Sequence, residues 1–185
     1  MNTTPGTTPA ALIRAVGDHA NGLAVVDGDT RLTFSELHDR VRDFAAALVA
    51  RGFRPGDRAA IWSPNTFHWE IAALGVHWAG GVVVPVNTRY TGSEAADIVE
   101  RVHAAALVVA GEFLGSDRFT QLRNAAPELV LPTVVRVPLG GNDAPRDDVF
   151  EWDDFLATAT EDLRTEADAR ANAVQPDDVA DILFT

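Results

Sequence analysis

The sequence predicts an α/β fold with a mostly parallel sheet and helices on both of its faces. Short apolar runs alternate with helical segments of about a dozen residues, the order typical of βαβ units. The run Val82–Pro85 shows no alternation of polar and apolar residues, as in strands that are buried on both faces. The segment that follows Thr66 is apolar on nearly every side, which indicates a helix buried between the sheet and another layer.

The individual elements follow from hydrophobic spacing and from the residues that begin and end them. We expect helices at residues 9–19, 34–51, 67–79, 92–103, 116–125 and 150–160. We expect strands at residues 23–27, 31–34, 59–62, 82–85, 106–109, 133–137 and 181–185, and a loop at 140–148. Gly28 predicts a tight turn between the first two strands, and Gly52 ends the second helix.

Two helix starts carry a full capping-box pattern. Thr33 with Glu36, and Thr91 with Glu94, place a hydroxyl and a carboxylate three residues apart before an apolar run. Asn65 or Thr66 is expected to cap the apolar helix between them.

Composition and charge exclude several classes of function. The 185 residues carry 15 basic and 27 acidic side chains, a net charge of −12, which argues against nucleic acid or an anionic membrane as partner. Every basic residue is Arg, so a phosphate-binding lysine is excluded, and the absence of Cys excludes thiol chemistry. No apolar run reaches the length of a membrane span, and Met1–Pro9 lacks the pattern of a secretory signal, so we expect a cytoplasmic protein.

The acidic residues are concentrated near the end of the chain. Residues 143–185 hold 13 acidic side chains and 3 Arg, a net charge of −10, and are expected to form surface helices and linkers. Adjacent Asp pairs in this region diverge and do not form a catalytic dyad.

Standard catalytic motifs are absent from the sequence. There is no Gly-x-Gly-x-x-Gly, no Gly-x-Ser-x-Gly and no His-Glu-x-x-His. His68 and His77 lie nine residues apart on the apolar helix, on roughly opposite sides of its axis. We interpret them as hydrogen-bonded helix histidines, and no metal site is predicted.

Two strand ends remain as candidate ligand sites, since ligands of open parallel sheets bind beyond the carboxyl ends of the strands. Ser63–Asn65 follows one strand and Asn87–Tyr90 follows another. Asn87 and Arg89 could hold a phosphate or a carboxylate. Alternatively, Asn87 fixes a turn and Arg89 pairs with a surface acid.

Four segments, in order along the chain, carry a resemblance to a known family. They are Leu32–Leu37, Gly52–Asn65 ("G-x-x-x-G-D-R-V-A-I…N"), Ala79–Arg89 ("A-G-A-x-x-V-P-x-N-x-R") and Asp178–Thr185. In these segments, over about Leu12–Thr185, the chain resembles the N-terminal part of the adenylate-forming enzymes: acyl-CoA synthetases, luciferases and peptide-synthetase adenylation domains.

The resemblance implies a function in two steps. A carboxylic acid attacks the α-phosphorus of ATP to form an acyl-adenylate, with Mg²⁺ present, and coenzyme A then displaces AMP. Residues 1–185 would form the N-terminal portion of the large AMP-binding domain, ending at the strand before the phosphate-binding loop and without the C-terminal domain. Thr185 would be the first residue of that loop, and Asn65, Asn87 and Arg89 would lie near the ligand.

The same resemblance places no catalytic residue in this chain, so we expect it to be inactive alone and to bind none of these cofactors tightly. A closer likeness, in Ile61–Thr66 and Pro85–Thr91, is to the actinobacterial acyl-CoA synthetases of steroid breakdown, which activate an indanedione propanoate.

Two other functions remain open. The chain could be a binding module that forms a homodimer, which its mass in solution at several concentrations would test. It could also be a freestanding nucleotide-binding domain that uses Asn87 and Arg89; calorimetry with ATP and AMP would then give a strong signal that Arg89→Ala abolishes.

Overall fold

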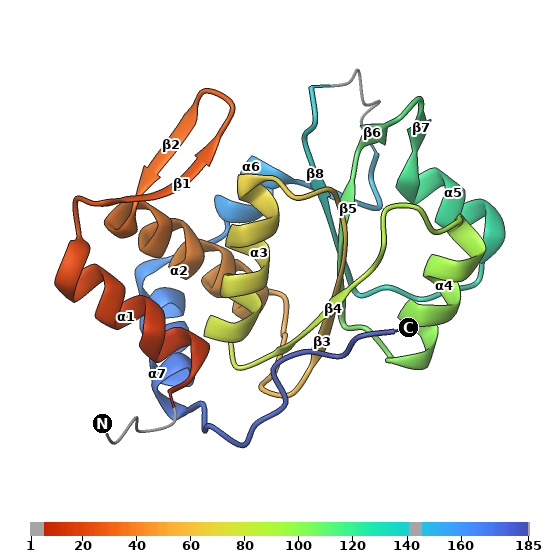
Figure 1. Ribbon diagram of the computed structural model, residues 1–185. Helices are drawn as coiled ribbons and strands as arrows, with labels where there is room; N and C mark the ends of the chain where they lie inside the picture. Colours follow the sequence, from red (N-terminus) through yellow and green to blue (C-terminus); the bar gives the residue numbers. More distant parts are fainter. Residues whose placement is uncertain (1–5, 141–145, 185) are drawn as a thin grey trace.

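A five-stranded parallel sheet lies between two layers of helices in the computed structural model, which describes residues 6–140 and 146–184 (Figure 1). The helices are α1 (Thr8–His19), α2 (Phe34–Ala50), α3 (Phe67–Trp78), α4 (Gly92–Arg101), α5 (Arg118–Ala125), α6 (Trp152–Leu156) and α7 (Glu161–Ala173). The strands are β1 (Leu23–Asp27), β2 (Thr30–Thr33), β3 (Arg58–Trp62), β4 (Val82–Pro85), β5 (Ala106–Ala110), β6 (Glu112–Phe113), β7 (Ser116–Asp117), β8 (Thr133–Val137) and β9 (Phe150–Glu151).

The main sheet has the strand order β4-β3-β5-β8-β9, and every pair in it is parallel. Ala60 of β3 lies opposite Val84 on one side and Leu107 on the other, so the carboxyl ends of these three strands meet at one edge. Two antiparallel hairpins, β1-β2 and β6-β7, stand apart from this sheet. The predicted fold class, mostly parallel with helices on both faces, is confirmed.

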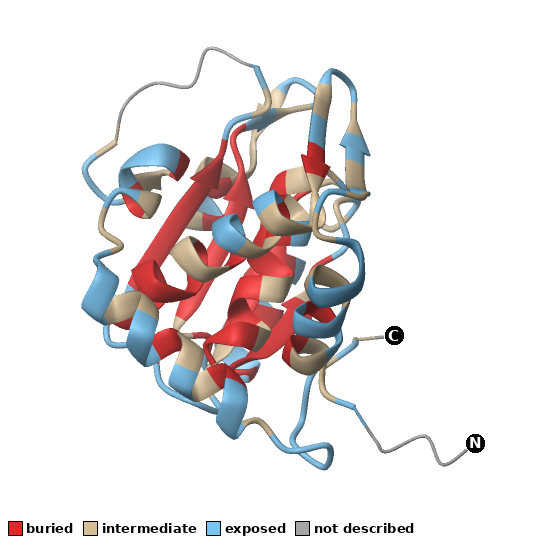
Figure 2. Cartoon of the chain, turned by 90° about the vertical axis from the view of Figure 1, so that its left-hand side faces the viewer, coloured by how far each residue is buried: buried red, intermediate tan, exposed pale blue. Residues whose placement is uncertain are grey.

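Two apolar clusters cover the two faces of the sheet. Successive residues of β3 alternate between them: Ile61 packs with α2, α3, α6 and α7, while Trp62 packs with α4 and α5. Figure 2 shows the buried strands at the centre and the exposed sides of the helices outside them. Since α3 is covered by the sheet on one side and by α1, α2 and α7 on others, its largely apolar composition is explained by contacts on several sides, with Glu70 left exposed.

Both predicted capping boxes are confirmed. The backbone N–H of Glu36 donates to Thr33 Oγ1 at 3.2 Å, and the N–H of Thr33 donates to Glu36 Oε2 at 2.8 Å. The Thr91–Glu94 pair repeats this geometry with distances of 3.3 and 2.7 Å. Hydrogen bonds from the threonine backbone and hydroxyl lower the pKa of each glutamate.

The start of α3 differs from the prediction of a side-chain cap. Thr66 is the N-cap residue, but its hydroxyl makes no capping hydrogen bond. Instead, the carboxylate of Asp27, at the end of β1, accepts a hydrogen bond of 3.0 Å from the N–H of Phe67. A residue 40 positions earlier in the chain therefore satisfies this helix end, which local sequence spacing does not indicate.

Three other predicted elements are wrong in part. Residues 150–160 do not form one helix, because Phe150–Glu151 pairs with β8 before the five-residue α6 begins. The helix expected from Ser116 starts at Arg118, because Ser116–Asp117 pairs with β6. Among the described residues of 181–184 there is no strand, only an isolated parallel bridge between Asp181 and Val83.

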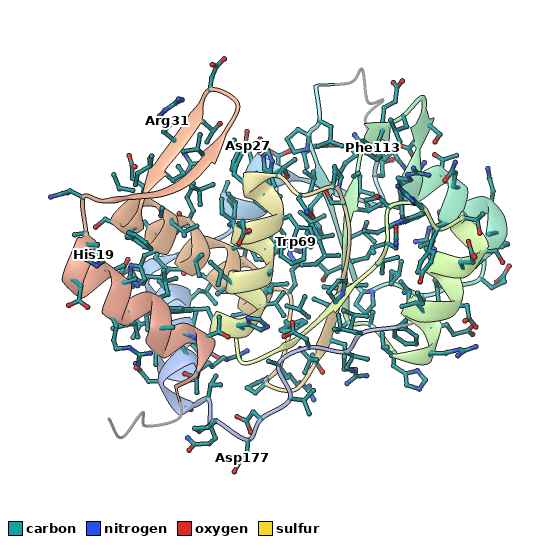
Figure 3. The ribbon with its side chains drawn as sticks, in the orientation of Figure 1. His19, Asp27, Arg31, Trp69, Phe113 and Asp177 are labelled. Atoms are coloured by element: carbon teal, nitrogen blue, oxygen red, sulfur yellow. The ribbon has the colours of Figure 1, made fainter. Side chains whose placement is uncertain are left out.

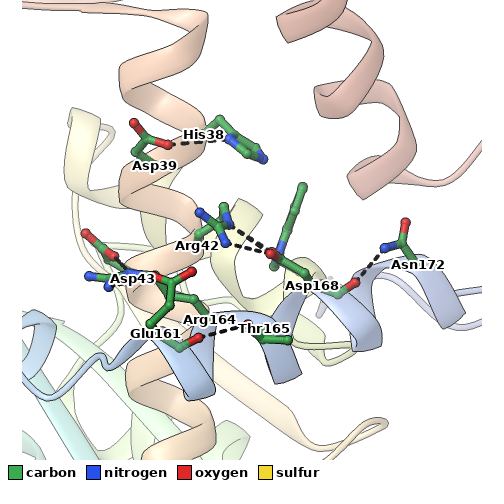
Figure 4. A network of polar contacts seen from close by, with 10 residues as sticks. His38, Asp39, Arg42, Asp43, Glu161, Arg164, Thr165, Asp168 and Asn172 are labelled. Carbon is green, nitrogen blue, oxygen red and sulfur yellow. Dashed lines mark hydrogen bonds and ion pairs between the residues drawn. The ribbon is translucent and has the colours of Figure 1, made fainter.

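The acidic region contains a well-packed helix, α7, that no individual prediction identified. Asp168 accepts hydrogen bonds from Arg42 Nε (2.9 Å), Arg42 Nη2 (2.6 Å) and Trp78 Nε1 (3.0 Å), joining α7 to α2 and α3 (Figure 4). Arg164 adds a second link to α2 through Asp43 at 2.6 Å. Part of the acidic surface is therefore used to fix α7 by ion pairs.

Candidate ligand-binding edge

The turns after β3 and β4 form a groove of about 460 Å³ at the carboxyl edge of the sheet. Trp69 of α3, labelled in Figure 3, lies on one of its walls. Its described lining residues are Ser63, Pro64, Asn65, Trp69, Pro85, Val86, Asn87, Thr88, Tyr90 and Phe184. The two candidate strand ends thus share one groove, in the position where open parallel sheets bind ligands.

Asn87 organises the turn after β4. Its side-chain oxygen accepts a hydrogen bond from the N–H of Arg89 at 2.9 Å, and its carbonyl accepts from the N–H of Tyr90 at 3.0 Å. The same carbonyl accepts from Trp62 Nε1 at 3.1 Å, which ties the turn to the end of β3. The interpretation that Asn87 fixes a turn is therefore confirmed, while its place in the groove leaves the side-chain NH₂ group available to a ligand.

Asn65 and Arg89 are both exposed at this edge, but their positions differ. Asn65 lines the groove, whereas Arg89 is not among the described residues that line it. No ion pair of the Arg89 guanidinium is formed within residues 6–140 and 146–184, so its predicted pairing with a surface acid is wrong for this part of the chain.

The last described residues approach the groove from the free edge of β4. Val83 donates its N–H to the carbonyl of Ala180 and accepts from the N–H of Ile182, both at 2.9 Å. The chain then runs parallel to β4, and Phe184 reaches the groove lining. Thr185, the predicted first residue of a phosphate-binding loop, lies outside the described residues.

Several buried polar atoms near this edge have no hydrogen-bond partner among the described residues. The hydroxyls of Ser63 and Thr66 and the Nε of Arg118 are in this group. The guanidinium of Arg118 lies 5.6 Å from the centres of the Trp62 and Phe113 rings. Arg118 is the first residue of α5 and comes after the β6-β7 hairpin that follows β5, so the residues directly after β3 and β4 did not point to it.

The two helix histidines have different environments. His68 is 8% exposed, its ring stacks on Phe67 and meets Trp152 edge-on, and burial lowers its pKa to about 4. Its Nδ1 has no partner among the described residues, so the prediction of a hydrogen-bonded histidine is wrong at this nitrogen. His77 Nε2 lies 3.2 Å from the carbonyl oxygen of Ala180, so that prediction is confirmed at this nitrogen.

The groove is polar without being acidic. Its described lining supplies amide and hydroxyl groups from Asn65, Asn87, Thr88, Ser63 and Tyr90, and no carboxylate. Within the described residues, no three His, Cys, Asp or Glu side chains gather as they would around a metal ion. In a chain of net charge −12, such a groove suits a ligand that carries negative charge or carbonyl oxygens.

The sequence model of one family, described as AMP-binding enzyme, matches residues 12–185, almost the whole chain. The chain belongs to this family.

Two curated relatives are similar over nearly the entire chain. The 3-[(3aS,4S,7aS)-7a-methyl-1,5-dioxo-octahydro-1H-inden-4-yl]propanoyl:CoA ligase of Rhodococcus jostii is 60% identical over 185 residues, which are 100% of this chain and 36% of the relative. The Mycobacterium tuberculosis ligase of the same name is 50% identical over 179 residues, 97% of this chain and 34% of the relative. The chain therefore spans about a third of the length of these relatives.

Solved structures of CoA ligases share the fold. Coronafacic acid ligase from Pectobacterium brasiliense matches with a TM-score of 0.78 and 15% identity, over 97% of this chain and 33% of that one. Acetoacetyl-CoA synthetase from Streptomyces lividans matches with a TM-score of 0.70 and 27% identity, over 84% of this chain and 25% of that one. In the part of this chain that the structure describes, no helix is long and apolar enough to cross a membrane.

Proposed function

We propose that residues 1–185 form the N-terminal portion of the large domain of an ATP-dependent acyl-CoA ligase, ending at the segment before its phosphate-binding loop. The complete enzyme would convert a bicyclic indanedione propanoate into its coenzyme A thioester. The observation that carries this proposal is the 60% identity, over all 185 residues, to the Rhodococcus ligase whose name gives that acyl group.

The proposed reaction transfers the acyl group twice. A carboxylate oxygen of the acid attacks the α-phosphorus of ATP, and pyrophosphate leaves with its bond electrons. The thiol of coenzyme A then loses its proton and attacks the acyl carbon, and AMP leaves. Mg²⁺ would accompany ATP and neutralise part of its charge, but the described residues bring together no set of ligands to which it can be assigned.

The groove supplies positioning in this scheme. Asn65 and Asn87 would orient polar groups of the ligands by hydrogen bonds, since their amides can donate and accept without adding charge. Thr185 would supply the first hydroxyl of the phosphate-binding loop, next to Phe184 in the groove lining. Arg89, exposed beside the groove, would attract anionic ligands to this edge.

The decisive experiment begins with the native reading frame beyond Thr185. The proposal predicts that it continues as Ser-Gly-Thr-Thr-Gly with a lysine soon after, and a stop codon at that point would contradict it. The complete protein is then assayed for acid-dependent pyrophosphate release and, by mass spectrometry, for the thioester. The indanedione propanoate and a straight-chain saturated fatty acid of equal carbon number are compared as substrates.

We expect kcat/KM for the indanedione propanoate to exceed that for the fatty acid at least about 100-fold. The fatty acid lacks the two ring carbonyls, and a site that hydrogen-bonds them would discriminate to this extent. Preference for the fatty acid would contradict the proposed substrate but retain the ligase reaction. No acid-dependent pyrophosphate release with either acid would contradict the reaction itself. The chain of residues 1–185 alone, with no lysine, serves as an inactive control.

The compartment and the oligomeric state are part of the same proposal. ATP and coenzyme A are cytoplasmic substrates, so we propose a cytoplasmic enzyme. A homodimer stays a prediction: sedimentation of the complete protein at several concentrations would give one mass for a monomer and a concentration-dependent mass for a reversible dimer.

A further inference from the structure

We propose that His77 is a positioning residue that holds the segment Ala180–Phe184 against β4, and that this contact sets the place of the phosphate-binding loop that would follow. Only the statement about the phosphate-binding loop rests on the proposed function. The contact between the histidine and the segment can be tested separately.

Backbone pairing alone holds this segment weakly. Within the described residues, two backbone hydrogen bonds link it to the sheet, those of Val83 with Ala180 and Ile182. Leu183 faces solvent with 71% of its surface exposed, while Ile182 and Phe184 are partly buried against the apolar cluster that includes α4 and α5. Ala180 and Asp181 are exposed and lack such packing, so a side-chain contact at these two residues would add to what fixes the start of the segment.

His77 supplies that contact from a rigid support. Its neighbours Val76 and Trp78 are 0% and 2% exposed, and the Trp78 indole is hydrogen-bonded to Asp168 of α7. The backbone of His77 is therefore fixed at the end of α3 by packing on both sides. Its own side chain is only 12% exposed.

The imidazole reaches two groups of the segment with one nitrogen. Nε2 lies 3.2 Å from the carbonyl oxygen of Ala180 and 3.4 Å from Asp181 Oδ1. With its proton on Nε2, the ring donates to that carbonyl, which also accepts from the N–H of Val83. The other ring nitrogen, Nδ1, has no partner among the described residues, so the ring's polar contacts in this part of the chain are all with the segment.

The contact lies directly upstream of the groove. Ala180 is four residues before Phe184, which lines the groove beside Asn87 and Tyr90, an extended distance of about 13 Å. A shift of the segment at Ala180 would therefore move Phe184 and whatever follows it relative to the turns after β3 and β4. His77 thus links the C-terminal end of α3 to the position of Phe184 in the groove lining.

The test uses the complete enzyme and four substitutions. His77→Phe keeps a ring of similar size and removes both polar contacts, while His77→Gln places a donor near the position of Nε2. His38→Phe is the matched control, because His38 also pairs with an aspartate, Asp39 at 3.7 Å, and contacts Trp78, but lies away from the segment. Asp181→Ala, at a side chain that is 46% exposed, removes one contact without disturbing α3.

Hydrogen-exchange mass spectrometry of the peptide covering Asp178–Phe184 is the first readout. We expect its exchange rate to rise about tenfold in His77→Phe and about threefold in Asp181→Ala, and to be close to wild type in His77→Gln and His38→Phe. The second readout is the KM for ATP, which should rise about tenfold in His77→Phe while the KM for the acid stays the same.

Each result decides a different statement. Unchanged exchange in both His77→Phe and Asp181→Ala would overturn the contact, whatever the activity. Faster exchange with an unchanged KM for ATP would overturn the link to the phosphate-binding loop. A wild-type enzyme without ATP-dependent ligation would contradict the proposed function and that link together, while the exchange data would still establish or refute the contact.

Discussion

The buried imidazole of His68 should make the stability of this chain fall with pH already between about pH 6.5 and 5, before most carboxylates titrate. Burial lowers its pKa to about 4, from an ordinary value of 6.5, although Asp27 and Asp153 act in the opposite direction. Unfolding releases this ring into water, where it binds a proton near pH 6.5. The stability that depends on neutral His68 is therefore complete above about pH 6.5 and is lost as the pH falls toward 4.

The size of the effect follows from the two pKa values. At pH 5 the unfolded state is almost fully protonated at His68 and the folded state hardly at all, which costs about 2 kcal/mol relative to neutral pH. At pH 4 the cost approaches about 3 kcal/mol. The packing of the ring against Phe67 and Trp152, within 3.8 and 4.8 Å between ring centres, is what keeps water away from it.

The assay is urea unfolding of the chain at pH 7.5, 6 and 5, comparing wild type with His68→Phe and His68→Gln. Both variants lose stability at pH 7.5, but neither can bind the proton. Their free energies of unfolding should therefore fall by about 2 kcal/mol less than that of the wild type between pH 7.5 and 5. Parallel curves for all three proteins would refute the assignment of a lowered pKa to His68.

Two further predictions concern the fold. Asp168→Ala should lower the free energy of unfolding by about 2 kcal/mol, because it leaves the Arg42 guanidinium and the Trp78 indole N–H partly buried without their acceptor. Thermal unfolding measures this change, and a decrease of less than about 0.5 kcal/mol would contradict the prediction. Gly92→Ala should cost more than about 2 kcal/mol, since the new Cβ would lie 2.2 Å from the carbonyl oxygen of Gln121. Gly17→Ala lies within α1 and has nothing within 4 Å of the new Cβ, so it should instead stabilise the chain by up to about 1 kcal/mol. A Gly92→Ala variant that is more stable than Gly17→Ala would contradict the close contact between α4 and α5.

Local signals allowed most of the fold to be predicted. The Thr33–Glu36 and Thr91–Glu94 capping boxes act over three residues, so their spacing alone identifies where α2 and α4 begin. The β-branched run Val82–Pro85 likewise identified β4 as a buried parallel strand. Each of these features is decided by neighbours in the sequence, and the structure confirms each of them.

The predictions failed where distant residues decide the outcome. Asp27 caps α3 from 40 residues away, and Phe150–Glu151 is a strand because β8 offers it an edge. The helix α7 buries only Ala167 and Ala171 deeply, so it lacks an apolar stripe that periodicity could detect. Its position depends on ion pairs to α2, which sequence spacing does not specify.

At the candidate site, the sequence located the right turns but not their full role. The sequence allowed Asn87 either to fix a turn or to bind a ligand. Its side-chain oxygen fixes the turn, and because the residue also lines the groove, the proposed ligand contact is compatible with that role. The contact of His77 with Ala180 joins residues 103 positions apart. Only the three-dimensional structure could bring these two together.

The distribution of charge explains why this part of an AMP-binding enzyme would position ligands and not react with them. Acidic residues of α7 form ion pairs with arginines: Asp168 with Arg42 joins α7 to α2, and Glu166 pairs with Arg170 within α7 itself. The groove offers neutral donors and acceptors, which would orient the proposed anionic ligand without the desolvation cost of a buried charge. Adenylation develops negative charge on phosphate oxygens, and its stabilisation needs cations fixed at the reacting atoms. The described lining of the groove contains no cationic side chain. We infer that the required cations come from other residues, and that the groove would serve to position the ligands.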